Sequence, residues 1–498
     1  MYNCEDKRLD MNTVASLQDL RKVFLILVFL LVFFIMLGPP QDADMWWHLR
    51  AGKEMVEEGK ILTTDLFSYT HYGEKWTNAF WLSDILLYLT YKVGGYLGLA
   101  LLTSLTAVLL MAVIYRQTSR NPFPLPSLVI LIAAVAMAPV WTPRPQIFSF
   151  LLLAILDYGL SGHNGFILKR PWLMVIIFIL WANIHGGFIW GFLLLIAYIV
   201  GNGIDNLLKR ENSLSLQQLF SLGIWTLIGT MAISINPSGL ALWKLPFYTV
   251  GVSIQSITEW GSPDFHRLDL HPILWLVFLI IIGAGTTRKT FSWSDILKTI
   301  GFSYMAFISQ RSIGPFVVVA TPVVINSLGQ AWLEWLSLIP KQIGRFYKPK
   351  QSKPFPVLFA TMLNILIVGV LIFVIAMRAY FVSTTQQVHN GLPLKAVEWI
   401  RAHQPEGRMF NAYNWGGYLQ WELPEYPVFI DGRADLFGEK TIGDWWRIVN
   451  ATDEGLALLD SWHVKFVLLE PGWPIADRLT QNGWRVLHAD ATAIILGR

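Results

Sequence analysis

Long apolar runs recur along most of the chain and are separated by short polar segments. A helix that crosses the hydrocarbon core of a bilayer needs about 20 apolar residues, within a range of roughly 17–25. The first run lacks a small-residue cleavage site and is followed by further runs, so we expect a retained span rather than a cleaved signal. The pattern predicts about eleven membrane-spanning helices, at 23–39, 93–115, 122–140, 147–161, 171–183, 187–203, 218–235, 272–287, 294–309, 313–328 and 356–377.

Two polar regions are too long to be turns between spans. Residues 40–92 hold two amphipathic stretches, 46–58 and 76–91, of the kind that lie as helices in the membrane interface. Residues 379–498 are more polar, and apolar and polar residues alternate along them, which predicts a small α/β domain. Within that domain we expect helices at 394–403, 453–461 and 474–482, strands at 427–431 and 465–469, and one or two strands over 485–496.

Composition supports a membrane protein. Of the 498 residues, 54% are hydrophobic and 14% charged, against roughly 25% charged in an ordinary soluble domain, and mean hydropathy is +0.46. These values exclude a disordered chain, a nucleic-acid-binding domain and a conventional soluble enzyme. The only cysteine, Cys4, excludes a disulfide framework and a cysteine-based metal site. The predicted fold is a polytopic α-helical membrane domain, residues 1–378 including the first outer loop 40–92, followed by an extracytoplasmic α/β domain, residues 379–498.

The distribution of Lys and Arg predicts the orientation. With the N-terminus in the cytoplasm, the inner segments hold about twice as many Lys and Arg residues as the outer segments before the last span. The basic linker 341–355 then anchors the inner face, where it can also meet anionic lipid head groups. We therefore expect a multi-pass protein of the plasma (inner) membrane with its C-terminal domain outside.

Polar residues that are costly beside hydrocarbon gather at the outer ends of the odd-numbered spans. Such groups tend to face a cavity or one another, so they predict a polar cavity that opens at the outer face. They are Asp42, Asp44, His48 and Arg50 after the first span, Arg144 and Gln146 after the third, Asn183 and His185 after the fifth, Asn236, Glu259, Asp264, His266 and Arg267 after the seventh, and Gln310 and Arg311 after the ninth.

Asp42 and Asp44 are candidates for catalysis or metal binding. Two carboxylates at this spacing can act as a general base or hold a hard cation such as Mg²⁺ or Mn²⁺. The alternative is helix capping, for which Asp44 is well placed at the start of the predicted helix. Arg144, held extended between two prolines, and Arg311 can each clamp a phosphate; the alternative is an interface anchor or an ion pair with an outer carboxylate.

The remaining polar residues carry weaker signals. His185 precedes two glycines that permit close approach of a helix or ligand, although a histidine at a helix end is more often a satisfied hydrogen-bonding group. His48 has no second histidine at zinc-ligand spacing. For Glu259, a solvated loop is the plainer interpretation. In the C-terminal domain, Gly416 and Gly417 mark a tight backbone position, and Asp431-Gly432-Arg433 follows a predicted strand, either as a turn with a local ion pair or as a loop that touches the acceptor.

With these residues the sequence resembles the GT-C superfamily of membrane glycosyltransferases. The resemblance rests on an Asp-containing first outer loop with two interface helices, an odd number of spans and an outer α/β domain. The segments that carry it are DADMWWHLRAGKEMVEEGKILTTDLFSYT, TPRPQ, NIHGGF and NAYNWGGYL with FIDGRADLF. The resemblance implies that Asp42 or Asp44 is the catalytic base and that Arg144 or Arg311 holds the donor phosphate. The WWD motif of oligosaccharyltransferases is absent, which argues against glycosylation of protein sequons.

The predicted function is transfer of a hexosyl or pentosyl unit, with inversion, from a polyprenyl-phosphate donor to a glycan, lipid or protein acceptor of the cell envelope. A metal is optional, because the leaving phosphate is already a stable anion. The candidate substrate-binding residues are His48, Gln146, Asn183, His185, Glu259, Asp431 and Arg433. Two alternatives stay open: a glycolipid transporter or flippase, and a non-catalytic envelope assembly protein.

Overall fold

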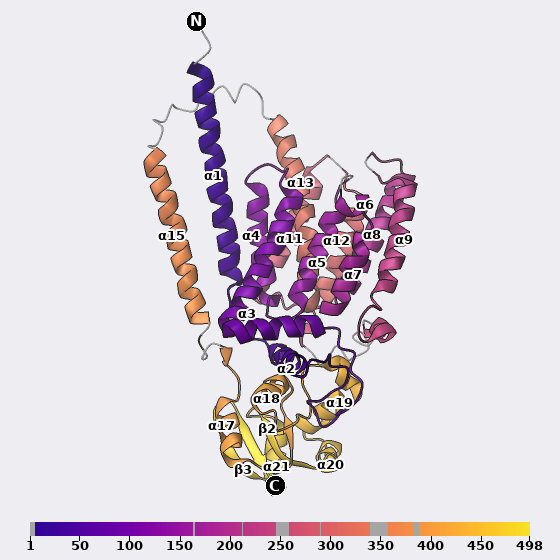
Figure 1. The fold of residues 1–498 in the computed structure, drawn as a ribbon, viewed down its shortest axis with the longest axis vertical. Coiled ribbons are helices and arrows are strands. Elements are labelled where there is room, and N and C mark those ends of the chain that lie inside the picture. Colours follow the sequence, from indigo (N-terminus) through magenta and orange to yellow (C-terminus); the bar gives the residue numbers. More distant parts are fainter. Residues whose placement is uncertain are drawn as a thin grey trace.

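The computed structural model describes residues 5–162, 165–211, 213–245, 258–288, 290–338, 357–382, 384 and 388–498. A bundle of helices forms one end of the molecule and a small α/β domain the other, with helix α2 (Ala43–Glu58) between them (Figure 1). The prediction of a mostly helical chain with a small C-terminal α/β domain is confirmed. The basic linker 341–355 lies outside the described residues.

Every predicted apolar run overlaps a helix. The helices of the bundle are α1 (Glu5–Met36), α3 (Trp81–Thr118), α4 (Leu125–Met137), α5 (Gln146–Leu160), α7 (Leu173–Ile184), α8 (Phe188–Leu207), α9 (Leu216–Ala232), α11 (His271–Thr286), α12 (Trp293–Ile308), α13 (Ile313–Leu338) and α15 (Val357–Val382).

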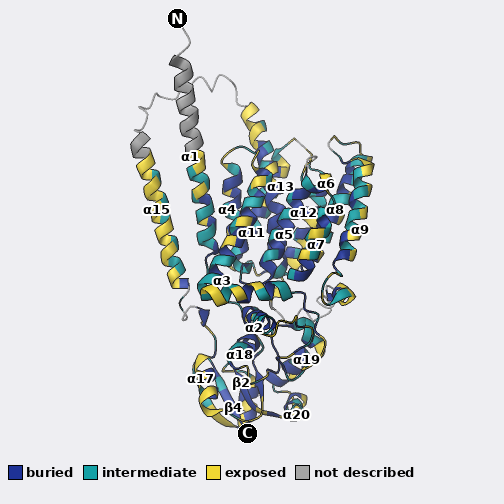
Figure 2. Cartoon of the chain, viewed as in Figure 1, coloured by how far each residue is buried: buried dark blue, intermediate teal, exposed yellow. Residues whose placement is uncertain are grey.

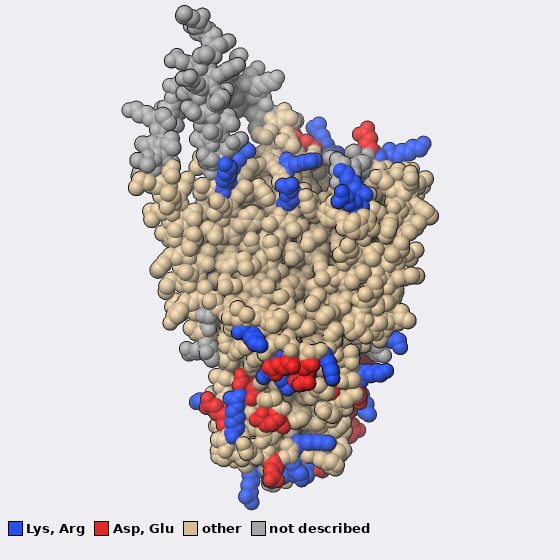
Figure 3. Space-filling model, viewed as in Figure 1, with Lys and Arg blue, Asp and Glu red and all other residues tan. Residues whose placement is uncertain are grey.

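The described residues contain five segments long and apolar enough to cross a membrane: 81–118, 188–207, 268–286, 310–337 and 361–382. Three shorter apolar helices accompany them. Charged side chains gather at the two ends of the visible face, and the band between them shows almost none (Figure 3). These features support a multi-pass membrane protein, whereas the exact number of crossings stays a prediction.

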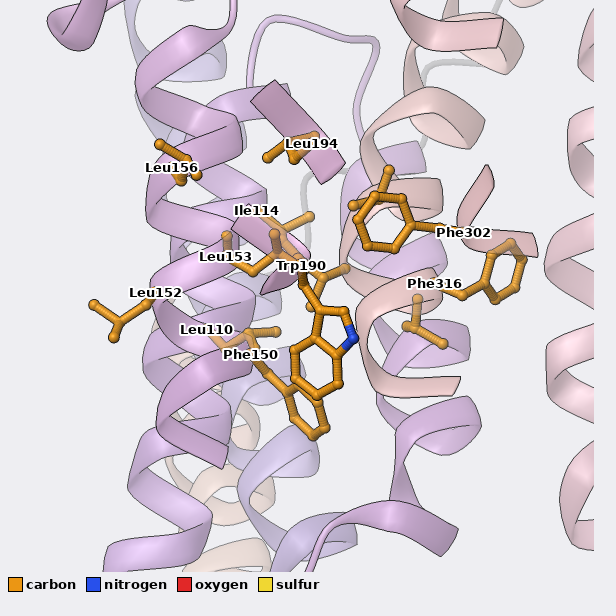
Figure 4. Close-up of a cluster of buried hydrophobic side chains, with 14 of the residues drawn as sticks. Leu110, Ile114, Phe150, Leu152, Leu153, Leu156, Trp190, Leu194, Phe302 and Phe316 are labelled. Carbon is orange, nitrogen blue, oxygen red and sulfur yellow. The ribbon is translucent and has the colours of Figure 1, made fainter. Parts of the chain in front are cut away.

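Aromatic and aliphatic side chains fill the middle of the bundle. Phe150 of α5 stacks on Trp190 of α8 with ring centroids 5.7 Å apart, and both are buried (Figure 4). Gly314 of α13 lets this pair sit close, because a side chain there would overlap the Phe150 ring. By contrast, α15 is largely exposed along its length (Figure 2), as expected of a helix that faces lipid.

The first outer loop folds onto the end of the bundle. Helix α2 contains the predicted 46–58 helix. The second predicted helix begins at Trp81 rather than at residue 76 and continues into the apolar span. Gly95, at φ 56° and ψ −147°, separates its two parts, and Figure 1 shows the first part lying across the ends of the bundle helices. Glycine suits this kink because a side chain is strained at such a positive φ.

The C-terminal domain has a four-stranded sheet in the order β1-β2-β4-β3, with β1 parallel to β2 and the other pairs antiparallel. Its elements are α17 (Leu394–His403), β1 (Arg408–Asn411), α18 (Gly416–Glu422), α19 (Ala434–Val449), α20 (Asp453–Ser461), β2 (Val464–Leu469), α21 (Pro474–Gln481), β3 (Arg485–Ala489) and β4 (Ile494–Gly497). The three predicted helices and the strands after residue 464 are confirmed.

The predicted strand at 427–431 is wrong. Its buried apolar residues resemble a strand, but Val428 forms only an isolated bridge, with Ser68 of the first outer loop. The chain at this point therefore joins the C-terminal domain to the outer loop instead of extending the sheet. Strand β1 and helices α18 and α19 were not predicted from the pattern.

Helix α2 shares a hydrophobic core with the C-terminal domain. Met45, Trp46 and Leu49 of α2 belong to the same buried cluster as the sheet residues. A side chain at Gly417 of α18 would come within 2.8 Å of the Ala43 carbonyl, so glycine permits the close approach of α18 to α2. This packing places loops of the C-terminal domain against the start of α2.

Candidate functional site

Arg144 joins three carboxylates from separate parts of the chain. It lies just before α5, and its side chain is mostly buried. Its Nη1 donates to Asp44 Oδ2 at 2.8 Å, and its Nη2 donates to Glu259 Oε2 at 2.9 Å. Its Nε lies 3.3 Å from Asp42 Oδ2. The predicted convergence of acidic and basic residues from distant segments is thus present.

The two aspartates differ in their roles in α2. Asp42 is the N-cap residue, and its Oδ1 accepts a hydrogen bond from the Asp44 backbone N–H at 2.8 Å. The expectation that Asp44 caps the helix is therefore wrong, because Asp44 already lies in the first turn. Asp44 Oδ1 accepts from Trp47 Nε1 at 3.1 Å. The side chain of Asp44 is 24% exposed and that of Asp42 is 8% exposed, so Asp44 is the more accessible carboxylate.

Burial and neighbouring charges shift the pKa values of the three acids in different directions. Burial raises the pKa of Asp44 to about 6, with Arg144 opposing the rise and the carboxylate of Asp42 adding to it. Burial also raises the pKa of Asp42. Burial alone would also raise the pKa of Glu259. The charge and hydrogen bond of Arg144 outweigh burial, so the pKa of Glu259 lies below its usual range. Asp44 is consequently a carboxylate that can exchange a proton near neutral pH.

Arg311 is a second cation beside this cluster. It lies in a short 3-10 turn, Gln310–Ser312, before α13, and its guanidinium is over the Trp260 ring at 5.8 Å. It is within electrostatic range of Arg144, Glu259 and Asp44. Within the described part of the chain, no carboxylate forms an ion pair with Arg311, whereas Arg144 is bound to three.

The Asp431-Gly432-Arg433 loop reaches the site through its glycine. A side chain at Gly432 would overlap Asp44 Oδ1, so the loop lies directly over that carboxylate. Asp431 and Arg433 are fully buried and point elsewhere: Arg433 binds Asp431 at 2.6 Å and Asp65 of the outer loop at 2.7 Å. The turn with a local ion pair is thus present, whereas contact of the loop with an acceptor stays a prediction.

Three other candidate residues support their neighbours. Gln146 Oε1 accepts from Arg144 at 3.3 Å, and its amide donates to a backbone carbonyl. Asn183 donates to two backbone carbonyls and accepts from the Trp81 indole at 2.7 Å, which ties α7 to neighbouring segments. His48 Nδ1 lies 2.6 Å from Asp84 Oδ1, and its ring packs against Trp47. These bonds fix the orientations of the three side chains.

His185 is held by α5 and by its own loop. Its Nδ1 lies 2.7 Å from Ser149 Oγ and accepts the Gly187 backbone N–H at 2.9 Å. The other outer polar residues are bonded away from the cluster. Arg50 pairs with Glu54, Asn236 donates to the Ala182 carbonyl, Asp264 pairs with His266, and Arg267 pairs with Asp269.

The sequence matches no protein-family model and no curated protein. Solved structures are similar in fold. The archaeal oligosaccharyltransferase AglB from Archaeoglobus fulgidus, in complex with an inhibitory peptide and a dolichol-phosphate, aligns with a TM-score of 0.60 and 12% identity, over 90% of this chain and 70% of that chain. ArnT from Cupriavidus metallidurans in the apo state aligns with a TM-score of 0.50 and 14% identity, over 97% of this chain and 98% of that chain. This chain has the fold of the GT-C glycosyltransferases.

On this GT-C fold, the described residues do not form a metal site. A divalent cation such as Mg²⁺ needs several oxygen ligands turned toward it. Asp42, Asp44 and Glu259 instead surround Arg144, and no group of three or more His, Cys, Asp or Glu side chains suited to a metal occurs in the described residues. The described residues, as they pair here, therefore offer no site for the optional Mg²⁺ or Mn²⁺, and the mechanism below uses no metal.

The C-terminal domain adds residues to the candidate site that the sequence did not indicate. Asp435, in the first turn of α19, accepts from the Trp76 indole at 3.3 Å and is within electrostatic range of Arg311. Burial raises its pKa. The ring of Tyr413 packs against Trp445, and its hydroxyl is within electrostatic range of Asp44 and Asp435. An acidic residue in the first turn of a helix can be recognised in a sequence, but Asp435 was missed because helix α19 was not predicted.

Proposed function

We propose that this chain is an integral-membrane glycosyltransferase that transfers a sugar from a polyprenyl-phosphate donor to an acceptor at the outer face of the plasma membrane. The observation that carries the proposal is that Asp44, whose pKa is about 6, lies within electrostatic range of Arg311, which has no ion-pair partner among the described residues. The lipid-linked donor is supported by the dolichol-phosphate in the AglB complex of similar fold.

The proposed mechanism is a single displacement. Asp44 takes the proton of the acceptor hydroxyl as the acceptor oxygen forms a bond to the anomeric carbon of the sugar. The bond between that carbon and the phosphate oxygen breaks on the opposite face, which inverts the configuration. The polyprenyl phosphate leaves as an anion, and the guanidinium of Arg311 stabilises its charge. Arg144 acts as a positioning residue, because its donors already hold Asp42, Asp44 and Glu259.

The function is tested with purified protein in proteoliposomes that contain radiolabelled polyprenyl-phosphate sugars. We expect label to move from lipid to an acceptor in the envelope fraction, with release of polyprenyl phosphate. Movement of intact labelled lipid across the bilayer, without cleavage of the sugar–phosphate bond, would instead identify a transporter. A reporter fused after Arg498 checks the proposed extracytoplasmic position of the C-terminal domain.

Replacing Arg311 with glutamine is expected to raise the KM for the lipid-linked donor about tenfold or more, because a charged hydrogen bond to phosphate is lost. Arg311→Lys should fall between this variant and the wild type, since it keeps the charge but loses the planar donor pair. Arg267→Gln is the matched control, because Arg267 is exposed and pairs with Asp269. An unchanged donor KM in Arg311→Gln would remove Arg311 from phosphate binding.

The rate of transfer should rise with pH through about 6, the pKa of Asp44. The base must be ionised to accept a proton, so kcat/KM should fall about tenfold per pH unit below that value. Because Asp42 and Asp44 interact, the measured value belongs to the pair. A pH profile of the initial rate checks this, and a rate that stays flat from about pH 5 to pH 7 would contradict Asp44 as the base.

A further inference from the structure

A chain of polar contacts runs behind His185. Trp181 Nε1 of α7 donates to Ser149 Oγ at 2.6 Å, and Ser149 Oγ lies 2.7 Å from His185 Nδ1. The Gly187 backbone N–H also points at Nδ1, at 2.9 Å. A backbone N–H can only donate, so Nδ1 is an acceptor and carries no proton. The Ser149 hydroxyl, which accepts from Trp181, therefore donates to His185.

These contacts leave the ring proton of His185 on Nε2. Burial, together with the charges of Arg311 and Arg144, lowers the pKa of His185 well below its usual range, which keeps the ring neutral. No described residue accepts a hydrogen bond from Nε2, and this atom is not among the partnerless side-chain atoms sealed from solvent. Nε2–H is thus a donor with a fixed direction and no hydrogen-bond partner among the described residues.

The Asn183-Ile184-His185-Gly186-Gly187 segment is built around this contact. A side chain at Gly187 would come within 2.6 Å of Nδ1 and 2.8 Å of Ser149 Oγ, so glycine is required for the bond. The His185 ring packs against Phe80 at 5.6 Å, and Phe80 in turn packs against the Trp47 ring beside Asp44. His185 therefore lies on the same side of the bundle as the carboxylate cluster.

We propose that His185 binds the phosphate of the lipid-linked donor through Nε2–H as an uncharged hydrogen-bond donor, and that the Gly187 backbone N–H and the Ser149 hydroxyl, both directed at Nδ1, hold it in this tautomer. The inference rests on the proposed glycosyltransferase function. Arg311 and Arg144 both act on His185 electrostatically, and Arg311 has no ion-pair partner among the described residues, so its charge favours an anion next to His185. A neutral donor stabilises the leaving phosphate without adding a third positive charge beside two arginines that already repel each other.

The binding test uses farnesyl phosphate as the probe, with the full-length protein in detergent and isothermal titration calorimetry. The amide nitrogen of glutamine reaches about as far as Nε2, whereas that of asparagine reaches only about as far as Nδ1. We expect His185→Asn to weaken binding about tenfold and His185→Gln to stay within about threefold of the wild type. Wild-type affinity in His185→Asn would overturn the proposal, as would equal losses in both variants.

The tautomer test uses protein labelled with ¹⁵N-histidine, and the signal that disappears in His185→Gln identifies His185. At neutral pH we expect a protonated Nε2 and an unprotonated Nδ1 in the wild type, and the same tautomer in Ser149→Ala, because the Gly187 backbone N–H still points at Nδ1 in that variant. An imidazolium, or a proton on Nδ1, would overturn the proposal.

The two proposals fail in different ways. If the wild type transfers sugar while His185→Asn binds farnesyl phosphate normally, the proposed role of His185 is contradicted and the transferase function is retained. If the wild type binds no farnesyl phosphate and transfers no sugar, the transferase function falls, and the role of His185 with it.

Discussion

Replacing Asp44 with asparagine is expected to lower kcat for sugar transfer by about 10²–10⁴-fold, the usual contribution of a general base. Asparagine keeps the size of the side chain and can still accept from the Trp47 indole, but it cannot take a proton from the acceptor hydroxyl. The affinity for the donor should change little, because Arg311 does not pair with Asp44. The measurement is the initial rate of label transfer at saturating donor.

Asp42→Asn is the matched control for this variant. Asparagine is as good an N-cap as aspartate, so α2 should keep its start, and the less accessible Asp42 should affect the rate far less. Asp44→Glu should recover part of the activity, since it restores a carboxylate. A reversed order, with Asp42→Asn inactive and Asp44→Asn active, would assign the base to Asp42. Full activity in both variants and in the double variant would falsify a catalytic role for either.

Replacing Arg433 with methionine is expected to lower the free energy of unfolding by about 3–5 kcal/mol, as is typical when one partner of a buried ion pair is removed. Arg433 is fully buried, and it binds Asp431 and Asp65, whose side chains are also fully buried. Its guanidinium additionally lies over the Trp76 ring at 5.0 Å. The change would leave two uncompensated carboxylates between the outer loop and the C-terminal domain.

Thermal unfolding of the purified protein measures this effect, and limited proteolysis should release the C-terminal domain more readily. Arg447→Met is the control, because Arg447 is half exposed and its pairing with Asp444 should contribute less than about 1 kcal/mol. Adding Asp65→Asn to Arg433→Met should restore part of the stability by removing one buried charge. Equal melting temperatures for Arg433→Met and Arg447→Met would show that the buried triad does not hold the two parts together.

Hydropathy predicted the helices because lipid imposes a simple requirement. A span must be apolar over about 20 residues and must satisfy its own backbone hydrogen bonds, so the run of side chains is itself the signal. Helices α17 and α20 of the C-terminal domain were also predicted, at 394–403 and 453–461, with the observed boundaries. The strand predicted at 427–431 failed because Phe429 and Ile430 are buried by contacts between the outer loop and the sheet domain, and burial alone does not make a strand.

The sequence by itself determined the class of fold, the places of the apolar helices and the segments from which the site is drawn, since these depend on local composition and spacing. Only the tertiary structure decided how the charges pair. Arg144 is bound to three carboxylates, and Arg311 has no such partner among the described residues. Those outcomes depend on which of several side chains comes within about 3 Å of another after segments 100 or more residues apart have packed, and no local pattern contains that information.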